Sequence, residues 1–166
     1  RGLDHPWSVA FLPGGDMLVT EKYPGRVRRV SPDGAVSPPL GGVPAVVADE
    51  NGGLLGLALD PDFAADRLVY LAYSEAGEDG STGLAVARGR LGEGRLDAVE
   101  VVFRQRPKVR GGQNYGGRIA FGPDGMLHVF AGNRFADELV QDVGNTLGAI
   151  ARVRPDGSVP PDNPFV

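Results

Sequence analysis

The fold is decided by a pattern of strand, turn and strand that is clearest in Ile119-Ala120-Phe121-Gly122-Pro123-Asp124-Gly125-Met126-Leu127-His128-Val129-Phe130-Ala131. Apolar runs on either side of a Pro-Asp-Gly turn predict two short strands that are joined tightly. The same order recurs in Val9-Ala10-Phe11 before Pro13 and in Leu57-Ala58-Leu59 before Pro61. We interpret these stretches as an internal repeat of about fifty residues.

The repeat predicts an all-β fold in which each unit contributes four short strands. A β-propeller with three four-stranded blades fits this pattern, with blades near residues 7–47, 54–104 and 118–158 of one half-propeller domain that spans 1–166. A small residue midway along the first strand of each unit suits the crowded centre of a propeller. The last strand of the first unit is expected near 43–47. A β-sandwich is the alternative, because short strands and regular turns fit it as well.

A chain with three blades cannot close a ring, since propellers typically have about four to eight blades. Open blade edges invite pairing with another chain. We therefore expect either a part of a larger propeller or a six-bladed homodimer of three plus three blades, and we favour the dimer. Alternating connections place the tight turns on one face and the variable segments on the other, so a site is expected on the face formed by residues 21–25, 48–53, 74–83, 110–117 and 132–147.

The composition of the 166 residues fits a single domain, and 42% hydrophobic residues can form a real core. The 26 Gly and 14 Pro recur at intervals, which indicates strands joined by turns. A net charge of −4 with scattered Lys and Arg argues against a nucleic-acid partner, and no apolar run is long enough to span a membrane. The absence of Cys excludes disulfides and thiolate sites. No signal peptide is recognisable, although the start at Arg1 is compatible with removal of a leader.

The loop Gly111-Gly112-Gln113-Asn114-Tyr115-Gly116-Gly117 is the strongest candidate for a binding site. Its glycines allow positive φ angles and close approach of the backbone to a ligand. They bracket three side chains that are able to point outward, beside a rigid strand. The simpler interpretation is an ordinary glycine-rich connection between two sheets, and composition alone favours it.

Four motifs together resemble the soluble pyrroloquinoline quinone (PQQ)-dependent aldose sugar dehydrogenases, or glucose/sorbosone dehydrogenase family: His5-Pro6-Trp7-Ser8-Val9-Ala10-Phe11-Leu12-Pro13, Gly52-Gly53-Leu54-Leu55-Gly56-Leu57-Ala58-Leu59-Asp60-Pro61-Asp62-Phe63, Gly116-Gly117-Arg118-Ile119-Ala120-Phe121-Gly122-Pro123-Asp124-Gly125 and Arg154-Pro155-Asp156-Gly157. The resemblance covers nearly the whole chain and corresponds to the first half of the family's propeller. It implies a six-bladed propeller, periplasmic or secreted, that binds PQQ on the channel face. It further implies calcium, which supports the fold and the cofactor, and a histidine base that assists hydride transfer from the anomeric carbon of an aldose.

The sequence departs from the family pattern where the resemblance places the chemistry. Asn114 stands at the position of the histidine base, and an amide cannot accept a proton near neutral pH. Asn51 stands where the family has a cofactor-contacting glutamine, and Asn133 where an acidic residue is common. We predict cofactor-binding positions at Asn51, Gln113, Tyr115, Asn133 and Arg134, and no metal ligands.

Three functional hypotheses follow from these residues. The first is a catalytically inactive half-propeller scaffold, divergent or engineered, that assembles as a homodimer. The second is a PQQ-dependent aldose sugar dehydrogenase that becomes active once another half completes it. The third is a carbohydrate-binding module that holds a small sugar on the channel face.

Overall fold

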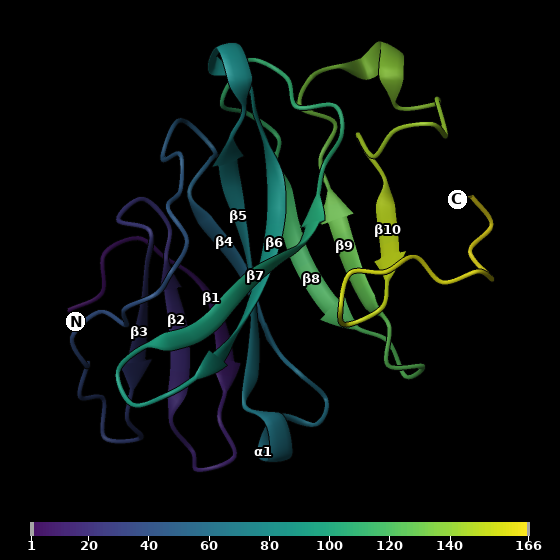
Figure 1. Ribbon diagram of the computed structural model, residues 1–166. Coiled ribbons are helices and arrows are strands. Elements are labelled where there is room, and N and C mark those ends of the chain that lie inside the picture. The colour runs from purple at the N-terminus through teal and green to yellow at the C-terminus, as the bar shows by residue number, and fades with distance from the viewer. Residues whose placement is uncertain (1, 166) are drawn as a thin grey trace.

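The structure is a computed structural model that describes residues 2–165. Its strands form three antiparallel sheets that lie side by side (Figure 1). The first sheet contains β1 (Pro6–Phe11), β2 (Met17–Glu21) and β3 (Arg26–Val30). The central sheet contains β4 (Leu54–Leu59), β5 (Leu68–Ala76), β6 (Thr82–Leu91) and β7 (Leu96–Arg104). The third sheet contains β8 (Gly116–Phe121), β9 (Leu127–Ala131) and β10 (Ile150–Val153).

The all-β class and the strand pairs flanking each Pro-containing turn are confirmed. The prediction of four strands in every unit is wrong for the described part of the chain, because only the central sheet has four. The strand expected near 43–47 does not form. After Leu40 the backbone leaves the first sheet: Gly41 pairs with Arg95, and the Val47 amide donates to the Ser74 carbonyl at 2.9 Å. Prolines at 38, 39 and 44 remove backbone donors, which also opposes a strand in this segment.

Short helices connect some of the strands. The sequence predicts only a turn after Asp60, whereas the structure has the one-turn helix α1 (Phe63–Asp66) there. Arg67 closes α1 in a left-handed conformation with φ of 64°. The single 3₁₀ turns η1 (Glu78–Gly80) and η2 (Asp137–Leu139) lie in the variable segments. Within residues 2–165, no helix is long and apolar enough to cross a membrane.

The central sheet is covered on both faces. One core cluster joins it to the first sheet and includes Leu18, Val27, Leu57 and Leu71. A second cluster joins it to the third sheet, with buried residues that include Tyr70, Val86, Ile119, Leu127 and Val129. The near-continuous burial of β4 matches the expectation from its apolar sequence.

The first strands of the three sheets, β1, β4 and β8, contact one another in sequence order. The approach of β4 to β8 is so close that a Cβ on Gly56 would lie 2.1 Å from the Gly117 carbonyl oxygen. Glycine is therefore required at position 56 by the packing of two backbones. The sequence predicts the small residue needed for close packing at Ala58, which marks the repeat. In the structure the residue at the closest contact is Gly56, two positions earlier.

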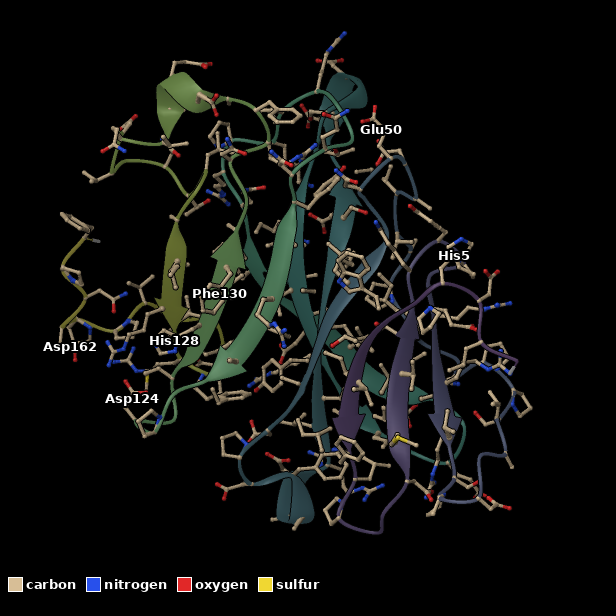
Figure 2. All side chains as sticks on the ribbon, turned by 180° about the vertical axis from the view of Figure 1, so that it is seen from behind. His5, Glu50, Asp124, His128, Phe130 and Asp162 are labelled. Carbon is tan, nitrogen blue, oxygen red and sulfur yellow. The ribbon has the colours of Figure 1, made fainter. Side chains whose placement is uncertain are left out.

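The loops sort into two ends of the molecule, as the alternation of connections predicts. The turns η1 and η2 lie at one end, at the top of Figure 1, and α1 lies at the other. Glu50, in the segment 48–53, lies at the same end as η1, and Asp124, in the tight turn after β8, lies toward the opposite end (Figure 2). We call the end that carries Glu50, η1 and η2 the upper end.

Candidate functional site

The loop of residues 110–117 enters the third sheet at the upper end and is held by its backbone. Asn114 has a positive φ of 49°, and Gly116 and Gly117 have φ of 73° and 94°. A Cβ on Gly116 would lie 2.4 Å from the Phe130 carbonyl oxygen, so this position needs glycine. The Gly132 amide donates to the Tyr115 carbonyl at 2.8 Å, which ties the loop to the segment after β9.

A row of polar side chains lies along this junction, and we call Asn114, Asn133 and Asp137 the amide row. The Asn114 side-chain nitrogen donates to the Asn133 side-chain oxygen at 3.2 Å. The Asn133 nitrogen donates in turn to a carboxylate oxygen of Asp137. The Phe135 amide also donates to the Asn133 oxygen at 3.4 Å. Asn114 and Asn133 are half-buried and Asp137 is exposed, so the row borders solvent.

Beneath the amide row, Arg134, Tyr115 and Thr82 form a buried cluster that we call the arginine clamp. Arg134 is only 5% exposed, and its guanidinium carbon lies 3.7 Å from the centre of the Tyr115 ring. Its nitrogens donate to the Gln113 carbonyl at 2.6 Å, to the Thr82 carbonyl at 2.8 Å and to the Gly111 carbonyl. The clamp therefore fixes both ends of the segment that carries Asn114.

Tyr115 completes the arginine clamp with its hydroxyl group. The hydroxyl donates to the Thr82 hydroxyl oxygen at 2.6 Å and lies 3.3 Å from a carboxylate oxygen of Asp49. Burial raises the pKa of the Tyr115 phenol, and burial also lowers the pKa of Arg134 from its ordinary value. Through the Tyr115 hydroxyl, the clamp also contacts Asp49, so it links the segment 48–53, the start of β6 and the segment after β9 at the upper end.

The structure brings five of the six predicted site residues into one neighbourhood: Gln113, Asn114, Tyr115, Asn133 and Arg134. Asn51, the sixth, is exposed on the adjoining segment, where its backbone amide donates to the Gly112 carbonyl at 2.8 Å. Gln113 is half-buried, and Tyr115 is fully buried. The placement of these residues is an observation, whereas their roles toward a cofactor stay predictions.

Thr82, Asp49 and Asp137 contact the predicted site residues, although the sequence did not predict them as members of the site. Thr82 lies 52 residues before Arg134 in the chain, so only the packing of β6 against the third sheet reveals their contact. Asp49 lies in the segment 48–53, which the sequence predicts to be at the upper end. This predicted placement is the one feature of the sequence that could have identified Asp49 as a site residue. Asp137 lies four residues after Asn133, a spacing that a turn brings together.

The arginine clamp does not fit an anionic quinone as it stands, because Arg134 is buried and four of its five N–H donors bond protein oxygens. A contact between Arg134 and a quinone would require this buried guanidinium to become accessible. No group of three or more His, Asp or Glu side chains within residues 2–165 is arranged to hold a metal ion. Calcium binding stays an implication of the family resemblance.

Comparison with known proteins identifies relatives across the whole chain. The glucose/sorbosone dehydrogenase family profile matches residues 3–166. The aldose sugar dehydrogenase YliI of Escherichia coli is 40% identical over 166 residues, which cover 99% of this chain and 45% of that protein. The crystal structure of the soluble aldose sugar dehydrogenase of Escherichia coli, in its apo-form, superimposes with a TM-score of 0.95 at 41% identity, over 99% of this chain and 48% of that one.

The PQQ-bound aldose sugar dehydrogenase of Streptomyces coelicolor matches with a TM-score of 0.89 at 41% identity and covers 99% of this chain. This chain in turn corresponds to 48% of that structure, so it spans about half the length of the relatives that it matches. The sequence match and the close superposition cover all three sheets and the loops of the upper end. The chain belongs to the glucose/sorbosone dehydrogenase family.

Proposed function

We propose that this chain is a catalytically inactive scaffold with the fold of a sugar dehydrogenase, and that the upper end is a vestigial or altered ligand site. The observation that carries the proposal is the amide row. The family resemblance assigns the general base to the position of Asn114, and this residue uses its side-chain nitrogen to bond Asn133.

The amide row cannot replace a histidine base. An amide stays neutral near pH 7, and it neither accepts nor releases a proton at a useful rate in that range. The two histidines of the chain are engaged elsewhere: His5 contacts the Asp4 carboxylate, and His128 lies within β9, paired with Ala120 and Arg152. Oxidation of an aldose hydroxyl therefore lacks a proton acceptor at the position where the family resemblance places one.

The buried state of Arg134 supports the same proposal. An anionic quinone needs positive charges that can reach it, and Arg134 directs its donors to backbone carbonyls inside the protein. PQQ, when bound to a family member, supplies the hydride acceptor. Here Asn51, Gln113, Tyr115 and Asn133 would contribute only neutral groups to such a site.

The test is reconstitution with PQQ and calcium, followed by dye reduction with an aldose. We expect no aldose-dependent dye reduction by the wild-type chain. The variant Asn114→His tests whether the missing histidine base is the only defect. Asn163→His serves as the matched control, because it introduces the same imidazole ring outside the amide row. Turnover by the wild-type protein would overturn the proposal, and turnover by Asn114→His alone would locate the defect at the base.

An active PQQ-dependent aldose sugar dehydrogenase is the second candidate, and the names of the relatives favour it. The Escherichia coli protein YliI and the Streptomyces coelicolor enzyme are both named aldose sugar dehydrogenases, at 40% and 41% identity. The reconstitution assay separates this candidate from the scaffold directly. A sugar-induced rise in Tm without quinone would instead support carbohydrate binding. By the family resemblance, we propose a periplasmic or secreted location.

A further inference from the structure

The amide row has a defined direction, because its members have defined roles as hydrogen-bond donors and acceptors. An asparagine side chain has an oxygen that accepts and a nitrogen that donates, so partners with a single role fix its orientation. Asn133 has two such partners. The ionised Asp137 carboxylate only accepts, and it faces the Asn133 nitrogen. The Phe135 backbone amide only donates, and it faces the Asn133 oxygen at 3.4 Å, so both partners select the same orientation.

The orientation of Asn133 determines that of Asn114. The Asn133 oxygen accepts from the Asn114 side-chain nitrogen at 3.2 Å, so this nitrogen faces into the row. Within residues 2–165, no hydrogen bond includes the Asn114 side-chain oxygen, and every buried side-chain oxygen or nitrogen has a partner. The Asn114 oxygen is therefore in contact with solvent. The amide row ends on an acceptor that no described protein group uses.

The backbone holds this acceptor in place before any ligand arrives. Asn114 has a φ of 49°, a conformation that asparagine adopts more readily than most residues. The carbonyl of Gln113, directly before it, accepts from the Arg134 guanidinium at 2.6 Å. The carbonyl of Tyr115, directly after it, accepts from the Gly132 amide at 2.8 Å. A group that is fixed in this way loses little freedom when it binds a ligand.

The charges around the row favour a neutral ligand. The solvent-facing group is the neutral Asn114 oxygen, and the other end of the row is the Asp137 carboxylate. Arg134 follows Asn133 in the chain, but it is only 5% exposed and donates to protein oxygens. An anion therefore gains no charge-assisted hydrogen bond from the row, whereas a hydroxyl group can donate to the Asn114 oxygen.

An exposed aromatic residue joins the row through its backbone. Phe135 is 61% exposed, and its amide faces the Asn133 oxygen. Arg134 and Phe135 have φ of 55° and 58°, and this turn accompanies a buried arginine followed by an exposed phenylalanine. A free acceptor and an exposed apolar ring at one junction match a pyranose sugar, which has hydroxyl groups at its edge and an apolar C–H face.

We propose that Asp137 sets the direction of the amide row, and that Asn114 thereby presents its side-chain oxygen to a hydroxyl group of a neutral pyranose sugar. Asp137 acts through Asn133, so it is a positioning residue. With the opposite direction, Asn114 would present its nitrogen and would favour ligands that only accept. This proposal rests on the proposed function, because it names the ligand class of the altered site at the upper end.

The test uses methyl α-D-glucopyranoside, with the affinity measured by NMR titration of the side-chain amide signals in the absence of quinone. This glucoside has hydroxyl donors but no free anomeric hydroxyl, so its binding is separate from oxidation. We expect it to bind and to shift the Asn114 side-chain signals. The fully methylated glucoside keeps the ring and its oxygens but has no hydroxyl group, and it is expected to bind about tenfold more weakly.

Two variants of η2 test the role of Asp137. Asp137→Lys places a donor against the Asn133 nitrogen, so Asn133 and Asn114 are expected to turn over and expose the Asn114 nitrogen. Affinity for the glucoside is expected to fall about tenfold, and the preference for it over its methylated form is expected to disappear. Glu138→Lys makes the same change of charge at the next residue, which is also exposed, and is expected to change affinity by less than about twofold.

Asn114→Gly removes the acceptor itself, and glycine adopts a φ of 49° without strain. We expect affinity for the glucoside to fall about tenfold in this variant. The proposal would be overturned by a wild-type protein that does not bind the glucoside or binds both glucosides equally. It would also be overturned by an unchanged affinity in Asn114→Gly, or by equal effects of Asp137→Lys and Glu138→Lys.

The wild-type comparison of the two glucosides needs no variant, so it tests the proposal even where a substitution unfolds the loop. Circular dichroism shows which variants are folded. Sugar binding without quinone and dye reduction with quinone are separate readouts. A protein that neither binds the glucoside nor reduces the dye refutes the acceptor site alone, and a protein that does both refutes the inactive scaffold alone.

Discussion

At the scale of single residues, the arrangement of Arg134 determines the geometry of the candidate site. A guanidinium has several donors in one plane, so it can bond carbonyls from different loops at the same time. In this chain those carbonyls belong to Thr82, Gly111 and Gln113, and the ring of Tyr115 covers the flat side of the group. Arg134 thereby orders the loop that displays Asn114.

We expect Arg134→Ala to lower the free energy of unfolding by about 3 kcal/mol, because buried carbonyls lose a charged donor. Arg110→Ala removes an exposed arginine of the same loop and is expected to change stability by less than about 0.5 kcal/mol. Urea unfolding of both variants checks the difference. Equal effects of the two substitutions would contradict the role that we assign to the clamp.

Two tyrosines of the central sheet predict a loss of stability at high pH. Burial raises the pKa of Tyr70 and of Tyr73 to about 12, from the ordinary value of 10.0. The unfolded chain then releases these protons before the folded protein does, so their contribution is complete below pH 10 and is lost between about pH 10 and pH 12. Urea unfolding across this window is expected to show falling stability, with a smaller slope in Tyr73→Phe. A slope that Tyr73→Phe leaves unchanged would contradict the prediction for that residue.

At the scale of elements, the contact between β4 and β8 sets how closely the central and third sheets approach. Gly56 faces the backbone of Gly117, and a methyl group has no room between them. Leu55 and Ile119, on the two strands, belong to the core cluster that forms at this contact. The packing of the central sheet against the third sheet therefore depends on the absence of a side chain at Gly56.

We expect Gly56→Ala to destabilise the protein by about 2 kcal/mol, since the two strands must move apart. Gly14→Ala is the matched control, because a Cβ at Gly14 meets nothing within 4 Å and its φ is not positive. The control is expected to be neutral or slightly stabilising. Thermal unfolding of the pair measures the difference, and a neutral Gly56→Ala would show that the strands can separate without cost.

At the scale of the whole molecule, polar contacts join the three sheets into one unit. The Thr20 hydroxyl donates to the Leu55 carbonyl at 2.9 Å, between the first and central sheets. Arg88 donates to the Pro155 carbonyl at 2.9 Å, and Gln105 donates to the Gly132 carbonyl at 2.7 Å, both toward the third sheet. These ties and the two core clusters predict one cooperative unfolding transition.

The sequence by itself determined the class of fold, the pairs of strands around each Pro-containing turn and the family. These features depend on local patterns: apolar runs such as Leu54–Leu59, turn residues such as Pro123 and Gly125, and motifs of contiguous residues. The same local information placed Asn114 and Asn133 in the variable segments at one end of the molecule.

Only the tertiary structure decided how the site is built. The prediction of a fourth strand near 43–47 failed because Gly41 and Val47 bond to the central sheet, which no local pattern records. The arginine clamp likewise joins Thr82 and Arg134 across 52 residues of sequence. Local patterns fix which residues form a strand or a turn. Contacts between distant segments depend on how sheets pack, and packing depends on the shape of every side chain in the interface.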